Sequence, residues 1–341
     1  MVSSPSAYID IEAIELPLVQ SSLSLNRKLH AEKLSLPQRI LVYAKIALSG
    51  RGVKFLVRSV PRMIRFRPDI VSCHSNLTLY HGLLFNLLLC KKFVLHVHAI
   101  SDAIAICNLP VLRWMVSRAS RIYCISESVR VKLSEVISFD KLQLSSTGVD
   151  PEVFFDTCSL RKKQIIQVGQ LMWYKGHQYL LEAMPTILAK HPDCELIIVG
   201  RGQFERKIVQ YIASLGLGDF VKMIPTLSHE RLRFLYNESS LLVMPSLYEG
   251  LPKVLLEAFA CGLPAVITEA CNATDISVGR AIIVPKESPA ALAEAVCSML
   301  DDRLRWEAYS HNCVSIVDTH DWRIISERIF EDYQRVLDSS H

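Results

Sequence analysis

Short apolar runs alternate with longer amphipathic stretches along most of the chain. In the first half, the runs that predict strands lie at 69–73, 93–99, 121–127 and 141–146. After a connector near 150–163, strands are predicted in QIIQVG, ELIIVG, FVKMIP, SLLVMPS and AVITE, with helices between them. Strands that alternate with helices indicate parallel βα arrays. Two successive arrays predict an α/β protein of two doubly wound domains that face each other, with ligands bound in the cleft, outside the carboxyl ends of the strands.

Length and composition agree with a two-domain protein that has a large core. The chain has 341 residues, of which 50% are hydrophobic and 21% charged. Its ten cysteines form no C-x-x-C pair, which suits a reducing cytosol and gives no sign of a zinc or redox centre. The amino terminus lacks a signal-peptide pattern, and the longest apolar run, LLFNLLLC at 83–90, is too short to span a bilayer. We therefore expect a chain that is neither secreted nor transmembrane.

Positive charge is concentrated in the first half. Residues 1–155 hold 19 basic and 11 acidic side chains, a net charge of +8, which leaves −4 for the other 186 residues. Much of this excess lies at spacings of three and four, in Arg51, Lys54, Arg58, Arg62 and Arg65. Such a basic stripe with apolar neighbours suits an anionic membrane surface, although a solvated face of an ordinary helix explains it equally well. We expect a cytoplasmic protein, peripheral on the inner face of the membrane, that binds no nucleic acid.

Three loops at strand ends in the second half carry the candidate chemistry. They are VGQLMWYKG (168–176), VGRGQ (199–203) and PSLYEGLP (245–252). Their glycines let backbone approach a ligand closely, the helix after Pro252 offers its amino terminus to an anion, and Lys175 adds a positive charge. No G-x-G-x-x-G follows the first strand of either half and no P-loop motif is present, which disfavours NAD and ATP. These features predict a diphosphate group within a nucleotide.

Two carboxylates flank this predicted anion site. Glu249 precedes the helix, and Glu257 lies about one and a half turns inside it, in an otherwise apolar segment. Carboxylates at the two ends of a diphosphate suit two groups with several hydroxyls, a sugar and a ribose. The alternative for Glu257 is an ion pair with Lys253, four residues earlier.

At these residues the sequence resembles the retaining GT-B glycosyltransferases of glycosyltransferase family 4. EGLPKVLLE resembles their E-x7-E motif, VGQLMWYKG their G-R-L…K-G segment, and VGRGQFERKI their glycine turn. RPDIVSCHS, VLHVHA, YCISESVRVKL and STGVDPEVF resemble first-domain strands and the interdomain linker, and DWRIISERIFEDYQRVL resembles the final helix that crosses back. The resemblance implies an acceptor-side Rossmann-like domain over 1–157, completed by a helix at 322–338, and a nucleotide-sugar-binding domain over 158–321.

The resemblance also implies a role for each matching residue. Glu249 would hold the hydroxyls of the donor sugar, Glu257 the ribose, and Lys175 the diphosphate leaving group. His98 would meet the transferred sugar; its alternative is a strand histidine with satisfied hydrogen bonds. The catalytic set is Glu249, Lys175 and His98, and the donor-binding set is Gly169, Gln170, Lys175, Gly200, Arg201, Gly250, Leu251 and Glu257. No metal or other cofactor is expected, and His96 with His98 makes a poor zinc site because a third ligand is missing.

The chain departs from the family pattern in two places. Gln170 stands where the family has a phosphate-binding arginine, and Arg201 is the nearby residue that would compensate for it. The first strand, glycine loop and helix of the family do not precede the segment near YIDIEAIELPL, so the first domain is expected to lack its first βα unit.

The sequence thus predicts a hexosyltransferase of retaining type. It would move a sugar from a nucleotide-diphosphate donor to a glycan or lipid-linked acceptor, in the synthesis of a cell-surface polysaccharide such as lipopolysaccharide. Two alternatives remain open: a catalytically impaired relative that binds nucleotide sugar or supports a partner enzyme, and a UDP-sugar epimerase of the same architecture.

Overall fold

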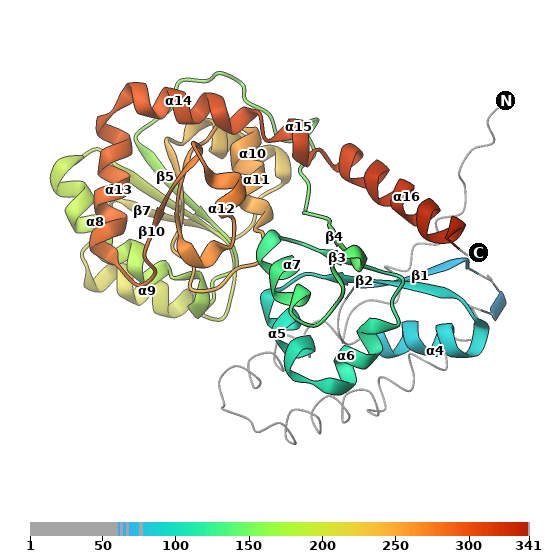
Figure 1. The fold of residues 1–341 in the computed structure, drawn as a ribbon. Coiled ribbons are helices and arrows are strands. Elements are labelled where there is room, and N and C mark those ends of the chain that lie inside the picture. Colours follow the sequence, from blue (N-terminus) through green and yellow to red (C-terminus); the bar gives the residue numbers. More distant parts are fainter. Residues whose placement is uncertain (1–60, 62–63, 66–67, 75–77, 340–341) are drawn as a thin grey trace.

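The computed structural model describes residues 61, 64–65, 68–74 and 78–339. The basic stripe, apart from exposed Arg65, and the segment in which the first βα unit was expected to be missing lie outside these residues. Two parallel sheets, each flanked by helices, make up the described part of the chain (Figure 1).

The first domain is a parallel sheet in the order β1-β2-β3-β4. Its strands are β1 (Ile70–Cys73), β2 (Lys92–Val97), β3 (Arg121–Cys124) and β4 (Leu142–Leu144), and its helices are α4 (Leu79–Leu89), α5 (Ile100–Asn108), α6 (Pro110–Ser117) and α7 (Glu127–Ser134). All four strands coincide with the apolar runs of the sequence, so these predictions are confirmed. Phe93, Leu95 and Ile122 lie in the core, together with Ile106 of α5.

The second domain is a six-stranded parallel sheet in the order β10-β9-β8-β5-β6-β7. Its strands are β5 (Gln164–Val168), β6 (Glu195–Val199), β7 (Val221–Ile224), β8 (Leu241–Met244), β9 (Ala265–Thr268) and β10 (Ala281–Val284). The helices are α8 (His177–Lys190), α9 (Glu205–Ser214), α10 (His229–Glu238), α11 (Lys253–Ala260), α12 (Thr274–Ser277), α13 (Pro289–Asp301) and α14 (Arg303–Val314). The first five strands confirm the sequence prediction, and β10 is an additional edge strand.

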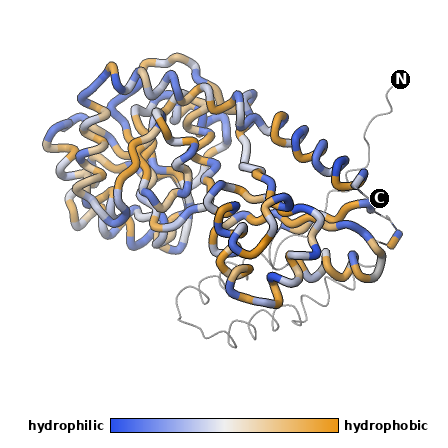
Figure 2. The backbone as a smooth tube through the Cα atoms, viewed as in Figure 1, coloured by the Kyte–Doolittle hydropathy of each residue, from blue (hydrophilic) through white to orange (hydrophobic). Residues whose placement is uncertain are grey.

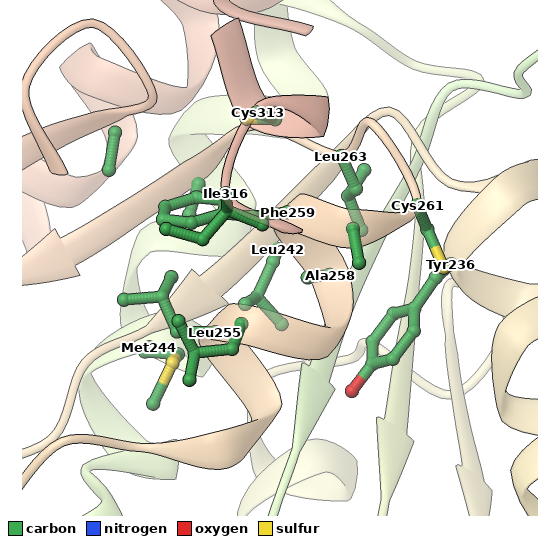
Figure 3. Close-up of a cluster of buried hydrophobic side chains, with 14 of the residues drawn as sticks. Tyr236, Leu242, Met244, Leu255, Ala258, Phe259, Cys261, Leu263, Cys313 and Ile316 are labelled. Atoms are coloured by element: carbon green, nitrogen blue, oxygen red, sulfur yellow. The ribbon is translucent and has the colours of Figure 1, made fainter. Parts of the chain in front are cut away.

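Both faces of this second sheet are buried. Consecutive strand residues point to opposite faces, so Ile165 packs into one core and Ile166 into the other. The core on the Ile166 side contains Tyr236 of α10 and Phe259 of α11 (Figure 3). A sheet covered on both faces explains why its strands read as continuous apolar runs.

The chain crosses between the domains twice. Around Val149 it runs from the first domain to the second, and it returns through α15 (Val317–His320) into α16 (Trp322–Asp338). Val149 and Asp321 pair where the two crossings meet. Helix α16 spans the residues expected for the final helix, and the boundary expected after residue 157 lies in the segment between β4 and β5.

Helix α16 lies along the first sheet, on the side away from α4 and α6 (Figure 1). Hydrophilic and hydrophobic residues alternate along its tube, as expected for a helix with one polar and one apolar face (Figure 2). Its buried Asp332 accepts a hydrogen bond from the Tyr123 hydroxyl at 2.7 Å and pairs with Arg121, whose Nε lies 3.1 Å away. These contacts fix α16 to the sheet.

No single helix among the described residues is long and apolar enough to cross a membrane. The bent pair α5 and α6, whose axes make an angle of 105°, has the length and composition for a broken span.

Candidate active site

The strand order creates a switch point beside β5. From β5 the chain runs outward through β6 and β7, and then returns to β8 on the other side of β5. The loops that follow β5 and β8 therefore leave the same edge of the sheet side by side, which is where doubly wound sheets bind ligands. The Leu247 amide donates a hydrogen bond to the Tyr174 carbonyl at 2.7 Å and joins the two loops.

Gly176 allows these loops to pack without a gap. Its φ of +66° is in the left-handed region, and a Cβ at this position would collide with the carbonyl oxygen of Pro245. Glycine is thus needed for both conformation and space at the start of α8.

The two loops bring Lys175 and Glu249 into direct contact. Lys175 Nζ forms a hydrogen-bonded ion pair with Glu249 Oε1, and their side chains are only 18% and 11% exposed. The Ser246 hydroxyl donates to the same carboxylate oxygen at 3.0 Å. The Glu249 backbone is held by hydrogen bonds to the Ala270 carbonyl and from the Asn272 amide. The sequence placed these two charges on different parts of a ligand, whereas the structure pairs them with each other.

Glycines 200 and 202 serve the packing of loop against loop. A Cβ on Gly200 would collide with the carbonyl of Gly169, and one on Gly202 would collide with the carbonyl of Leu171. Gly169 faces the Lys175 side chain, whose Cε lies 3.6 Å from the position of a Cβ. Close approach to protein backbone thus accounts for Gly200 and Gly202, which the sequence had assigned to close approach of a ligand.

Gln170 and Arg201 lie at the edge of this constellation. Both residues are exposed, and neither side chain has a hydrogen-bond partner among the residues that the structure describes. The Arg201 carbonyl accepts the Leu171 amide at 2.9 Å, which fixes the backbone of one loop on the other. The structure does not bring the guanidinium of Arg201 onto Lys175 or Glu249.

Glu257 is half-buried on α11, one helix away from Tyr236 of α10. The fully buried Tyr236 hydroxyl donates to Glu257 Oε2 at 3.3 Å. Burial raises the pKa of Glu257, and Tyr236, His229 and Lys253 only partly oppose that rise. Lys253 Nζ lies instead over the Trp322 ring, 5.6 Å from its centroid, and makes no ion pair with Glu257. The carboxylate therefore has hydrogen-bonding capacity left for a ligand.

His98 lies where the first domain contacts the second. It follows β2, and its carbonyl oxygen lies 3.0 Å from the position that a Cβ on Gly250 would take. The neighbouring Tyr248 hydroxyl accepts a hydrogen bond from the Ser101 amide at 3.3 Å. The Glu249 loop thus touches the first domain beside His98, and Leu251 is buried behind it.

His98 is one of three stacked imidazoles. His74, which follows β1, lies with its ring centroid 4.3 Å from that of His96 and 5.5 Å from that of His98. Burial lowers the pKa of all three histidines, and their mutual repulsion adds to the effect on His96, whose pKa falls to about 3. The rings are therefore neutral at pH 7. Among the described residues, no group of three His, Cys, Asp or Glu side chains is placed to hold a metal ion.

The sequence matches two protein-family models that adjoin each other. Residues 152–314 match "Glycosyl transferases group 1", and residues 25–153 match "Glycosyltransferase Family 4". The chain belongs to the family 4 glycosyltransferases. Its second-domain match contains Lys175, Glu249 and Glu257, and its first-domain match contains His98.

Individual relatives agree with this family assignment. An uncharacterized glycosyltransferase of Haemophilus influenzae is 41% identical over 107 residues, 31% of this chain and 30% of that protein. The gpi3 subunit of phosphatidylinositol N-acetylglucosaminyltransferase from Schizosaccharomyces pombe is 22% identical over 302 residues, 82% of this chain and 64% of that protein. The chain spans less than two thirds of the length of these two relatives.

The solved structure of Anabaena HepE in complex with UDP shares the fold. It superposes with a TM-score of 0.73 at 19% identity and covers 82% of both chains. The expected GT-B architecture, two Rossmann-like domains, is confirmed.

Several residues of the site were not predicted from the sequence. Ser246 and Tyr236 contact the two glutamates, and His74 contacts His98. Ser246 lies three residues before Glu249, a spacing that suggests a local hydrogen bond. The partners of Glu257 and His98 lie 21 and 24 residues away along the chain, and only the packing of α10 and the pairing of β1 with β2 bring them near.

Proposed function

We propose that the protein is a retaining glycosyltransferase that moves a sugar from a nucleotide-diphosphate donor to a hydroxyl group of a glycan or lipid-linked acceptor. The observation that carries this proposal is the Lys175–Glu249 pair at the switch point, with Glu257 on the next helix. Retention of the anomeric configuration follows from the resemblance of Glu249 and Glu257 to the E-x7-E motif.

The donor would lie along the amino terminus of α11. Lys175 and the first amides of α11 offer positive charge to a diphosphate, which is a good combination for an anion at a helix start. Glu249 then faces the sugar side and Glu257 the ribose side. UDP in the HepE complex supports a nucleotide donor for this fold.

Each residue in this arrangement has one task. Lys175 stabilises the charge that develops on the departing diphosphate, and its partner Glu249 keeps the ammonium in place until a sugar hydroxyl shares the carboxylate. Ser246 and Asn272 hold Glu249 and thereby reduce the reorganisation needed on binding. His98 contributes a neutral imidazole from the opposite domain. These groups supply the required charge, so we propose that no metal ion or other cofactor takes part.

The acceptor would approach from the first domain. The name of the Schizosaccharomyces pombe relative points to a phosphatidylinositol acceptor for that protein. A lipid-linked acceptor, met by a cytoplasmic protein at the inner face of the membrane, is the corresponding proposal here, and the basic stripe around residues 51–65 would provide the attraction.

The experiment is a hydrolysis and transfer assay of the purified protein with a panel of UDP-, GDP- and ADP-sugars. We expect slow release of free sugar from one donor, and the first-formed anomer, read by proton NMR, should have the donor's configuration. The same protein with Glu249→Gln should bind that donor but turn it over far more slowly. Release of the inverted anomer would contradict retention, and donor binding without turnover would indicate the catalytically impaired alternative.

A further inference from the structure

A continuous chain of hydrogen-bonding groups ends on the candidate catalytic histidine. It begins at His96, whose Nε2 lies 3.1 Å from the hydroxyl of Tyr333 on α16. Tyr333 donates to the Ser72 hydroxyl at 3.3 Å, and Ser72 Oγ lies 3.0 Å from Nε2 of His74. Nδ1 of His74 lies 3.3 Å from Nε2 of His98. The five residues lie on β1, on β2, directly after these strands, or on α16.

The number of protons fixes the first links of this chain. Tyr333 has one hydroxyl proton, and because it goes to Ser72, the Tyr333 oxygen must accept from an Nε2–H on His96. Ser72 accepts from Tyr333 and still has its own proton to donate, and Nε2 of His74, 3.0 Å away, is the acceptor in the proposed chain.

A neutral imidazole has one N–H and one acceptor nitrogen. His74 accepts at Nε2 and therefore carries its proton on Nδ1, from which it donates to Nε2 of His98. His98 must then carry its own proton on Nδ1. Within the described residues, Nδ1 of His98 makes no hydrogen bond to a protein group.

We propose that Tyr333, Ser72 and His74 form a positioning chain that holds His98 in the Nδ1–H tautomer and so presents a hydrogen-bond donor to the transferred sugar. The proposal rests on the proposed function, because it gives a task to the Nδ1–H that the site would use. His74, Ser72 and Tyr333 act through His98 and do not touch the substrate. The ring nitrogen that carries the proton is set by the hydrogen bond of the other nitrogen, as for other functional histidines.

The surroundings favour the neutral form of all three histidines at pH 7. Burial is the main cause of the lowered pKa of His74, His96 and His98, and the positive charge of Lys253 adds to it at His98. Tyr123 stacks on His96 with ring centroids 4.6 Å apart, while its hydroxyl donates to Asp332, which in turn pairs with Arg121. The Asp332–Arg121 pair thus holds the Tyr123 ring against His96. It also holds α16, which carries Tyr333, on the sheet.

The chain of hydrogen bonds also depends on α16. Of the five residues in this hydrogen-bonded chain, Tyr333 is the only one outside β1, β2 and the residues that directly follow them. It lies on α16, which follows the second domain in the sequence and packs on the first. A displacement of α16 from the sheet would remove the donor to Ser72 and free the His98 tautomer.

The tautomer is measured directly in protein labelled with 15N-histidine. Two-bond correlations from the ring protons to Nδ1 and Nε2 distinguish the two neutral forms at pH 7.5, and the His98 signals are assigned by their absence in His98→Gln. We expect His98 as Nδ1–H in the unchanged protein. In His74→Leu we expect it to move toward Nε2–H, the usual form in water.

Two further variants and one control keep the experiment decisive. His74→Asn places an amide donor near the position of Nδ1 and should restore the Nδ1–H form of His98, while Tyr333→Phe, which keeps the ring, should give a mixture of the two tautomers. Tyr211→Phe, which removes a hydroxyl bound to Glu182 on the second domain, should change nothing. An Nε2–H form of His98 in the unchanged protein, or a tautomer that does not respond to His74→Leu or Tyr333→Phe, would overturn the proposal.

Kinetics supply the second arm once a donor is known. Groups that orient metal-bound histidines are typically worth about ten- to a hundredfold in activity, and by analogy we expect a loss of this size in the kcat of His74→Leu with little change in the KM for the donor. His74→Asn should recover most of the loss. If the unchanged protein shows no turnover, the proposed function fails, while the tautomer measurement still tests the positioning chain. If kcat falls in His74→Leu without a change of the His98 tautomer, the positioning chain is wrong and the proposed function stands.

Discussion

Replacement of Glu257 by glutamine should make the free protein more stable and its nucleotide complex weaker. The carboxylate is half-buried on α11, it accepts one hydrogen bond from Tyr236, and burial raises its pKa. Glutamine has the same shape and can still accept the Tyr236 hydrogen bond through its amide oxygen. It removes the cost of the buried charge but also the charge that would bind the ribose hydroxyls.

The signs of both effects follow from this contact pattern. Because burial raises the pKa of Glu257, its charged form costs the folded protein stability at pH 7, and Glu257→Gln should raise the free energy of unfolding there. A hydrogen bond to a charged group is worth about 1.5–3 kcal/mol. Loss of one such bond to ribose corresponds to roughly ten- to a hundredfold weaker nucleotide binding.

The stability difference should depend on pH in one direction. The pKa of Glu257 is higher in the folded than in the unfolded protein, so its charge destabilises the fold above the folded pKa, and this cost disappears as the pH falls through that value. The gain from Glu257→Gln should therefore be full at pH 7 and shrink as the pH falls toward the ordinary glutamate pKa of 4.5.

Urea denaturation of both proteins at several pH values measures the stability, and titration calorimetry with the preferred nucleotide measures the affinity. A variant that is less stable at pH 7, or whose affinity for the nucleotide equals that of the unchanged protein, would refute this account of Glu257. An ion pair with Lys253, the alternative that the sequence left open, predicts a small loss of stability instead.

Two further predictions concern the loops at the switch point. Lys175→Ala should lower turnover about 10²–10³-fold, as loss of one charge-stabilising donor does, whereas Gln170→Arg should leave turnover unchanged or raise it. Steady-state kinetics measure both changes, and equal effects would contradict the assignment of the diphosphate charge to Lys175. Gly176→Ala and Gly216→Ala both place alanine at positive φ, which costs about 1–2 kcal/mol of stability. Only Gly176 faces a carbonyl, so its variant should lose about 1–3 kcal/mol more in the free energy of unfolding. Equal losses in urea denaturation would show that the two loops have room to separate.

Much of this architecture could be predicted from local patterns. Apolar runs located β1 to β9, because both faces of each central strand are buried or nearly so. The Lys175, Glu249 and Glu257 positions followed from glycine-containing loops at strand ends. Strand β10 (Ala281–Val284) was not among the predicted strands, although its sequence, AIIV, is apolar.

The contacts within the site could not be predicted, because they depend on strand order and register. Lys175 meets Glu249, 74 residues away, only since β8 lies beside β5. His74 reaches His98 only since β1 pairs with β2 in a register that places Cys73 opposite Leu95. The packing role of Gly200 likewise depends on the neighbouring loop, whose carbonyl at Gly169 leaves no space for a Cβ.

The central claim is that the cleft beside β5 and β8 binds a nucleotide sugar through Lys175 and Glu257. Calorimetric titration of the purified chain with UDP-, GDP- and ADP-sugars tests this claim most directly. The account predicts that at least one donor binds, that Lys175→Ala and Glu257→Gln each weaken it by roughly tenfold or more, the effect of a lost charge-assisted hydrogen bond, and that Gly216→Ala leaves it unchanged. Absence of binding by every donor at millimolar concentration, or equal affinities in all four proteins, would contradict it.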